Sequence, residues 1–153
     1  MISKLEEVIK QREMFGNKAE NLSILSNHGI LVPRGIAVSY EQYQSYLESR
    51  ILSDEFQNEL VRGLDTYSGK FSVRSSANVE DSGQRSYAGQ FKTILDVSKD
   101  EIPEAIKKVY ESGINFHSSY SNDPVKMGLI IQEMINADIS GVLFTYDLIN
   151  QNP

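Results

Sequence analysis

The sequence contains no cysteine, which excludes disulfide bonds, thiolate zinc sites and cysteine nucleophiles. It also lacks any apolar run near the ~20 residues that a membrane-spanning helix requires. The amino-terminal stretch carries Glu6, Glu7 and Glu13, and such acidic residues are not typical of a signal peptide. We therefore expect a cytoplasmic protein with no membrane partner.

Positive charge is scarce, with 15 lysines and arginines against 21 acidic residues and a net charge of −6. Because affinity for a nucleic-acid backbone depends on clustered cations, an acidic chain without a long basic run is a poor candidate for that role, and we expect no nucleic-acid partner. A few well-placed donors can still hold a small anion. The length of 153 residues suits one domain rather than two.

Apolar periodicity predicts an α+β fold of separated helices and strands. The pattern favours helices over about 3–15, 17–28, 39–47, 53–63 and 100–112. It favours strands over 71–73, 91–97, 127–135 and 141–145. It also favours a strand within 30–38, whose first part, 30–33, is either a short buried strand or an extended entry. Residues 74–77 read as a small polar turn, 78–90 as a loop and 136–138 as a hairpin turn.

A lysine stands near the predicted start of the second helix. Lys18 follows Gly16 and Asn17, in the first turn, where unpaired backbone N–H groups favour an anion. Taken alone, however, this segment favours a solvated lysine on a surface helix, because exposed lysines are common.

An arginine leaves the predicted strand that ends at Val73. Arg74 is followed by Ser75 and Ser76, and a guanidinium beside hydroxyls can grip a phosphate through two parallel hydrogen bonds. Arg74 could equally form an ion pair with Glu80 or Asp81 and so stabilise the loop predicted at 78–90.

A loop of small residues precedes the strand predicted at 91–97. It contains Ser86, Ala88, Gly89 and Gln90, and such loops allow backbone amides to approach phosphates closely. It is neither a Walker loop nor a dinucleotide fingerprint, and taken alone it is compatible with an ordinary turn.

The three segments just described and three others follow one another along nearly the whole chain. They are Gly16–Leu22, Gly29–Gly35, the Val-Arg-Ser-Ser-Ala run at 73–77 with Glu-Asp after it, the Ser-Tyr-Ala-Gly-Gln loop at 86–90, Gln132–Met134 and the Ser-Gly-Val-Leu-Phe-Thr segment at 140–145. In this order and spacing the chain resembles the amino-terminal ATP-binding portion of the pyruvate phosphate dikinase and phosphoenolpyruvate synthase family, which includes rifampicin phosphotransferase.

The resemblance implies the amino-terminal lobe of an ATP-grasp-like domain, spanning 1–153, with nucleotide held between two lobes. Lys18 and Arg74 would contact the ATP phosphates, and the loop of Ser86, Ala88, Gly89 and Gln90 would be a lid, with Thr93 behind it. The base would lie at the lobe junction. The residues there would be Gln132, Glu133 and Met134.

The family pattern continues into parts that this sequence does not contain. The second lobe and the acidic Mg²⁺ ligands that it supplies are missing, as is the phosphohistidine domain, and the usual Asp-Pro reads Asp147-Leu148. His28 and His117 lack the family's histidine context, so we expect no catalytic residue here. A second chain or a downstream domain would complete the site.

The leading hypothesis is the ATP-binding part of a phosphotransferase that acts on pyruvate through phosphohistidine, inactive as a lone chain and dependent on ATP and Mg²⁺. One alternative is the ATP lobe of an antibiotic phosphotransferase. The other is a non-catalytic interaction or regulatory module that keeps the fold.

Overall fold

The computed structural model describes residues 1–77, 91–120 and 125–141, with backbone alone at 116–120. In these residues the strands form one antiparallel sheet of five, in the order β1-β2-β5-β3-β4. The strands are β1 (Ile2–Lys4), β2 (Gly35–Val38), β3 (Phe71–Ala77), β4 (Thr93–Val97) and β5 (Met127–Glu133). The fold is therefore α+β, as the sequence predicted.

The central strand β5 is buried on both faces. Its first six residues are all buried, which explains why Met127–Gln132 is almost continuously apolar instead of alternating. It pairs with β2 through Ile130 opposite Ala37 and with β3 through Ile130 opposite Arg74. The register of β5 therefore fixes where the predicted site residues of β3 lie.

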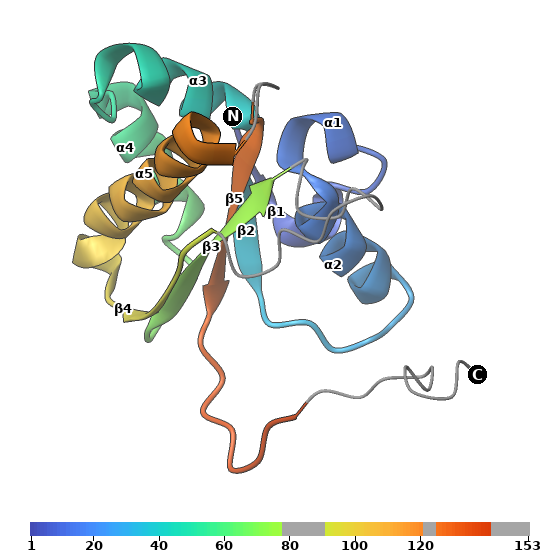
Figure 1. Ribbon diagram of the computed structural model, residues 1–153. Coiled ribbons are helices and arrows are strands. Elements are labelled where there is room, and N and C mark those ends of the chain that lie inside the picture. Colours follow the sequence, from blue (N-terminus) through green and yellow to red (C-terminus); the bar gives the residue numbers. More distant parts are fainter. Residues whose placement is uncertain (78–90, 121–124, 142–153) are drawn as a thin grey trace.

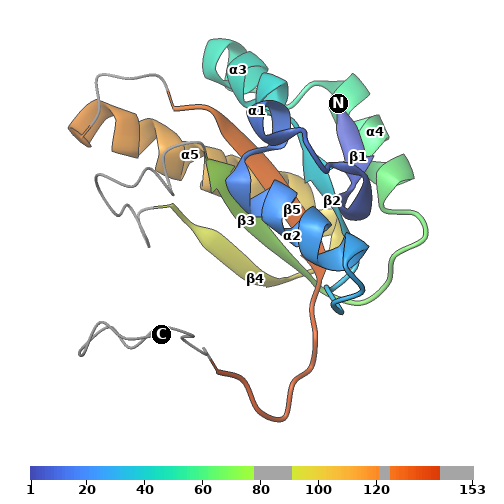
Figure 2. The ribbon, with the colours of Figure 1, turned by 90° about the vertical axis from the view of Figure 1, so that its right-hand side faces the viewer.

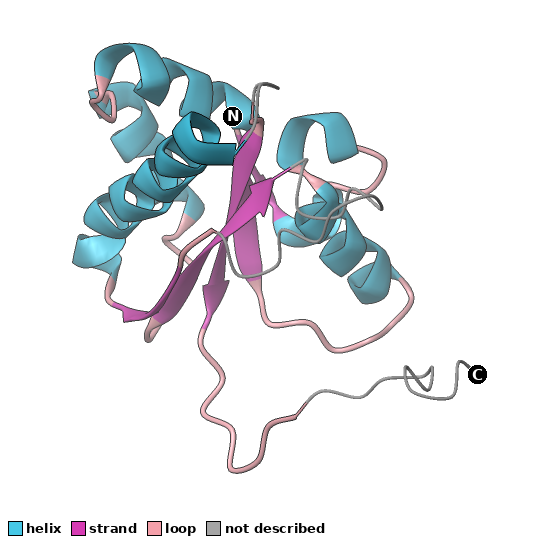
Figure 3. Cartoon of the chain, viewed as in Figure 1, coloured by secondary structure: helices cyan, strands magenta, loops and turns pink. Residues whose placement is uncertain are grey.

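Helices cover the sheet from both sides (Figures 1 and 3). The helices are α1 (Arg12–Phe15), α2 (Asn17–Asn27), α3 (Tyr40–Ser49), α4 (Asp54–Gly63) and α5 (Ile102–Tyr120), with short 3-10 turns at Leu5–Glu7 and Lys99–Glu101. A larger core fills the face under α3, α4 and α5. A smaller one lies under α1 and α2, built from Leu5, Val8, Phe15, Ala19, Ala37 and Ile130.

The coverage of the α2 side is incomplete. Figure 2 shows α1 and α2 in front of β2 and β5, whereas no helix of the described chain lies over β4 on that side. Only the start of α2 reaches β3, at Ser76. Thr93 and Leu95 of β4 are accordingly exposed. In the part of the chain that the structure describes, this face of β4 and of the adjoining stretch of β3 is thus open, and we call it the open face.

Most of the predicted helices are confirmed, but the one at the start of the chain is wrong. Ile2–Lys4 is a strand, with Ile2 opposite Val38. Helical structure in the predicted range is limited to the 3-10 turn at Leu5–Glu7 and the short α1 at Arg12–Phe15. Strand pairing with β2 overrides the local capping signal of Ser3 and Glu6. The carbonyl of Glu6 instead accepts hydrogen bonds from Ser23 and Asn27 of α2.

Two predictions about strands also need correction. Residues 74–77, predicted as a turn, continue β3 through Ala77, because Ser75 and Ser76 are small enough to be buried opposite Leu129 and Gly128. The segment 30–33 is no strand: Leu31 is fully exposed, and β2 begins only at Gly35. The predicted strand at 141–145 extends beyond the described residues.

Three tyrosines join α3 to α5. The ring of Tyr110 lies 5.1 Å from that of Tyr43 and 5.3 Å from that of Tyr46, centroid to centroid. Tyr46 donates a hydrogen bond of 2.9 Å to Glu111, whereas the buried Tyr110 hydroxyl has no partner among the described residues. The two hydroxyl groups should therefore contribute differently to stability.

We expect Tyr110→Phe to leave the free energy of unfolding unchanged or to raise it, because the variant removes a buried polar group that lacks a hydrogen bond. Tyr46→Phe should lower it by about 1 kcal/mol through loss of the bond to Glu111. Urea unfolding of both variants tests this. A Tyr110→Phe variant less stable than Tyr46→Phe would contradict the assignment.

The same tyrosines predict a loss of stability in alkali. Burial raises the pKa of Tyr43 to about 12 and, together with the Glu111 hydrogen bond, that of Tyr46 to about 12. Because the unfolded chain releases these protons near pH 10 and the native chain retains them, the free energy of unfolding should fall as pH rises above 10. Urea midpoints at pH 9 and 11 measure the fall, which Tyr46→Phe should reduce. Equal midpoints at the two pH values would refute the prediction.

Candidate nucleotide site

The start of α2 rests directly on β3. Gly16 precedes the helix with φ of 83°, and a Cβ atom there would lie 2.1 Å from the carbonyl oxygen of Ser76. The backbone N–H of Ala19 donates a 3.1 Å hydrogen bond to Ser76 Oγ. The hydroxyl of Ser76 therefore caps α2 from the neighbouring strand, and is used in the fold rather than offered to a ligand.

Lys18 is brought to the end of β3 by this arrangement. Its Nζ donates a 3.0 Å hydrogen bond to the carbonyl oxygen of Ser75, and the side chain is only partly buried. The ammonium group is thus held beside β3 rather than extended into solvent. A contact between Lys18 and an anion stays a prediction.

Arg74 lies on the open face of the sheet. Ser76 points to α2, so the alternation of β3 places Arg74 on the same face. The side chain is half-buried, and it makes no hydrogen bond or ion pair with the part of the chain that the structure describes. Glu80 and Asp81, its predicted alternative partners, lie outside the described residues.

Thr93 lies beside Arg74 on the neighbouring strand. It stands opposite Arg74 on β4 and therefore shares its face, where it is exposed. The structure thus brings together Lys18, Arg74 and Thr93, which come from three separate segments. The predicted lid residues Ser86, Ala88, Gly89 and Gln90 lie outside the described residues.

The third predicted group lies at the end of β5. Gln132 is buried and donates a 2.9 Å hydrogen bond to the carbonyl oxygen of Pro33, and Glu133 forms an ion pair of 3.3 Å with Arg34. Both side chains are thus engaged by the chain itself. Met134 is 37% exposed. A contact between this group and a base stays a prediction, and the main-chain edge and Met134 are what it can offer.

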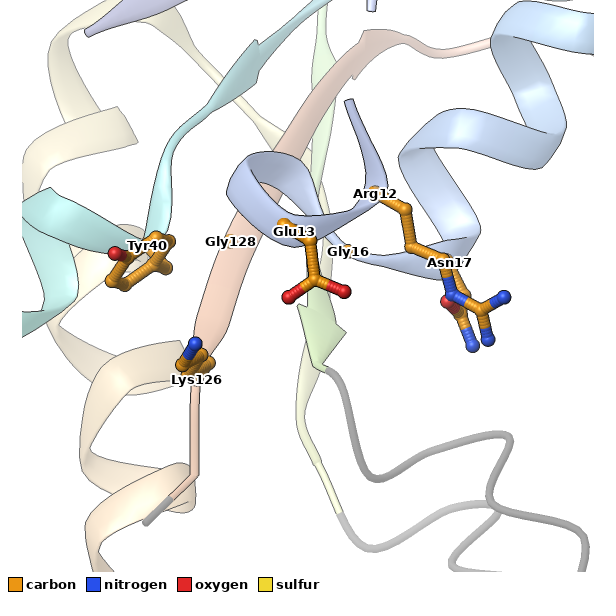
Figure 4. A pocket seen from close by; sticks show the side chains of 7 residues that line it. All are labelled: Arg12, Glu13, Gly16, Asn17, Tyr40, Lys126 and Gly128. Atoms are coloured by element: carbon orange, nitrogen blue, oxygen red, sulfur yellow. The ribbon is translucent and has the colours of Figure 1, made fainter. Parts of the chain in front are cut away.

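A pocket that the sequence did not reveal adjoins the start of α2 (Figure 4). Its volume is about 260 Å³, and its lining residues are Arg12, Glu13, Gly16, Asn17, Tyr40, Lys126 and Gly128. Lys126 Nζ lies 5.2 Å from the centroid of the Tyr40 ring. Lys126 follows a segment without a motif, so no sequence signal linked it to Arg12 or to Lys18.

The pocket and the open face carry positive charge but no visible metal site. Arg12 and Lys126 line the pocket with one carboxylate, Glu13. No group of three or more histidine or acidic side chains in the described chain is arranged to hold a metal ion. None of its helices is both long and apolar enough to cross a membrane.

Comparison with known proteins identifies the family of this domain. Residues 54–153 match the family described as "Pyruvate phosphate dikinase, AMP/ATP-binding domain". The chain belongs to this family. That match contains Arg74, Thr93 and Gln132–Met134, whereas Lys18 lies before it.

Relatives of this domain family align with most of the chain. It is 31% identical to a rifampicin phosphotransferase of Bacillus cereus over 94% of the chain, and 28% identical to a phosphoenolpyruvate synthase of Aeropyrum pernix over 92%. It is 29% identical to an uncharacterized phosphotransferase, YvkC, of Bacillus subtilis over 87%. The chain spans only 19–24% of the length of these three proteins.

The close packing of Gly16 on Ser76 predicts an asymmetry between two glycines of this dikinase-type domain. Gly29 also has a positive φ, of 79°, but no atom lies within 4 Å of the place of its Cβ. Gly29→Ala should therefore cost only the roughly 1–3 kcal/mol of a strained backbone, and Gly16→Ala clearly more. Urea unfolding of both variants measures the difference. Equal losses would show that α2 does not depend on this contact.

Proposed function

We propose that this chain is the phosphate- and base-binding lobe of an ATP-dependent phosphotransferase, with an ATP-grasp-like fold. ATP would lie on the open face of β3 and β4, under a second lobe from another domain or chain. The observation that carries the proposal is Arg74, a half-buried arginine on this face without a partner in the described chain. An arginine in that state fits a phosphate, because its planar fork can bind two oxygens at once.

The arrangement along β3 and β5 supports an extended nucleotide. Lys18 stands at the end of β3 near Ser75, and Arg74 lies opposite Ile130. From Ile130 to Glu133 is three residues, or about 10 Å of strand. A nucleoside triphosphate can bridge this separation, with its phosphates at Lys18 and Arg74 and its base near Glu133.

Apolar side chains gather at the proposed base end. Leu95 is 59% exposed on the open side of β4, and Ile135 is 62% exposed just beyond β5. Met134 is also partly exposed there. Exposed apolar groups of this kind can cover the faces of a purine, while the cations neutralise phosphate charge at the other end.

ATP would supply the phosphoryl group, and this lobe would hold and orient it. Phosphoryl transfer depends mainly on positioning and charge neutralisation, for which Lys18 and Arg74 are suitable. Mg²⁺ would accompany the phosphates, with its carboxylate ligands coming from the second lobe. Pyruvate, reached through a phosphohistidine, is the proposed acceptor in the complete enzyme.

A second acceptor is favoured by one observation. The relative named rifampicin phosphotransferase is 31% identical over 94% of the chain, a similarity comparable to that of the phosphoenolpyruvate synthases. An antibiotic hydroxyl is therefore the alternative acceptor. Both alternatives use the same ATP lobe, so the test below applies to either.

We expect the 153-residue chain to bind Mg-ATP weakly in calorimetric titration and not to hydrolyse it. Lys18→Ala and Arg74→Ala should each weaken binding by about tenfold or more, as loss of a charge-assisted hydrogen bond predicts. Arg50→Ala is the matched control, because it removes an ion pair of 3.4 Å with Glu111 under the opposite sheet face.

Circular dichroism should show that all variants are folded. A folded native chain that binds no Mg-ATP at millimolar concentration would refute the proposal. Binding that is equal in the native chain and in Arg74→Ala would also refute it. Turnover by the lone chain would show that it needs no second lobe.

A further inference from the structure

Three residues at the end of β5 form a compact cluster, which we call the Arg34 clamp: Arg34, Tyr67 and Glu133. Arg34 Nε lies 3.3 Å from Glu133 Oε2, and the guanidinium carbon lies 4.9 Å from the centroid of the Tyr67 ring. Arg34 also donates a 2.9 Å hydrogen bond to the carbonyl oxygen of Thr66. One arginine therefore uses its charge, its planar face and its fork at the same place.

The clamp ties the end of β5 to two loops. The N–H of Glu133 donates to the carbonyl oxygen of Arg34 at 2.9 Å, and the N–H of Met134 donates to that of Lys70 at 2.8 Å. The N–H of Ser68 donates to Glu133 Oε1 at 3.0 Å. Main chain from three segments is thus held around Glu133, whose two carboxylate oxygens bind different partners.

Tyr67 holds the Arg34 clamp against the residue that follows Arg34. Its hydroxyl donates a 3.1 Å hydrogen bond to the carbonyl oxygen of Gly35, the residue next to Arg34. Burial, followed by the charge of Glu6, raises the pKa of Tyr67, which keeps this hydroxyl protonated as a donor. The ring is buried, so it offers Arg34 a fixed surface.

An exposed ion pair usually contributes little stability, about 0–1 kcal/mol. The Arg34 side chain is 62% exposed, and it contacts Glu133, the last residue of β5, together with Thr66 and Tyr67 of one loop. After Glu133 the described chain leaves the sheet. A strand end of this kind frays unless it is held. The clamp therefore orders a short stretch of main chain more than it stabilises the whole fold.

We propose that Arg34 is a positioning residue for the base end of the nucleotide site. By holding Glu133, it keeps the main chain at 133–135 fixed as a preformed edge, without touching the nucleotide itself. Because the N–H groups of Glu133 and Met134 are bonded within the protein, the groups of this edge left for a purine would be its carbonyl oxygens and the N–H of Ile135. A preformed edge removes an ordering cost from binding, so it increases affinity only for ligands that carry a base. This inference rests on the proposed function and names its ligand class: purine nucleotides rather than polyphosphates.

The experiment compares Mg-ATP with inorganic tripolyphosphate, titrated into the native chain and into Arg34→Ala. We expect Arg34→Ala to weaken Mg-ATP binding by about tenfold, because the main chain at 133–135 would then have to be ordered when the base binds. Binding of tripolyphosphate should be unchanged. Arg34→Lys keeps the charge without the planar fork, so its affinity for Mg-ATP should lie between those of the native chain and Arg34→Ala. Arg50→Ala, which breaks the ion pair with Glu111, should change neither affinity.

Amide hydrogen exchange gives a readout that does not depend on ligand. In Arg34→Ala, exchange should quicken at 133–135 and stay unchanged in the rest of β5. Glu133→Gln is the second variant, because it keeps the size of the side chain while removing the charge that Arg34 binds. It should show the same selective loss of Mg-ATP affinity.

The outcomes separate the inference from the proposed function. A native chain that binds neither ligand refutes both. A native chain that binds both, with Arg34→Ala weakening both equally or neither, refutes the positioning role and leaves the phosphate site intact. Unchanged exchange at 133–135 in the two variants also overturns the role of the clamp.

Discussion

The contact between Gly16 and Ser76 is the constraint on which the site depends. It brings the backbone of the α1–α2 junction against β3 more closely than any side chain would allow, and Ser76 Oγ then accepts from Ala19 N. Because α2 starts there, Lys18 stands next to Ser75, and the helix leaves the open face uncovered. The position of one cation and the exposure of the other follow from a single close approach.

Local sequence signals were sufficient where the chain itself decides the structure. The helix predicted over 53–63 is an example: α4 forms there, and Ser53 caps it by accepting a hydrogen bond from Phe56 N. They failed where tertiary pairing decides: Ile2–Lys4 became a strand because β2 offers an edge, and Ser75 and Ser76 extended β3 because their burial opposite β5 outweighs their preference for turns.

The site was predictable in its residue types but less so in its geometry. The residues themselves indicated Lys18 and Arg74, and the family resemblance added Thr93; the fold places Lys18 beside Ser75 and Thr93 opposite Arg74. The sequence could not show that Ser76 is a helix cap or that Gln132 binds Pro33, because such pairings join residues far apart in the sequence. For the same reason Arg34, although it lies within the Gly29–Gly35 segment, carried no signal of its own.

The two ends of the proposed site are built on different physical principles. At the phosphate end, Lys18 and Arg74 supply charge, and Arg74 keeps it available because no described residue neutralises it. At the base end, the charges of Arg34 and Glu133 cancel each other in an ion pair, so what remains is an ordered main-chain edge beside apolar side chains. Charge that is neutralised within the protein cannot attract phosphate, but it can hold a strand end in place. A ligand that is anionic at one end and flat and uncharged at the other matches both halves, and a nucleoside triphosphate has that form.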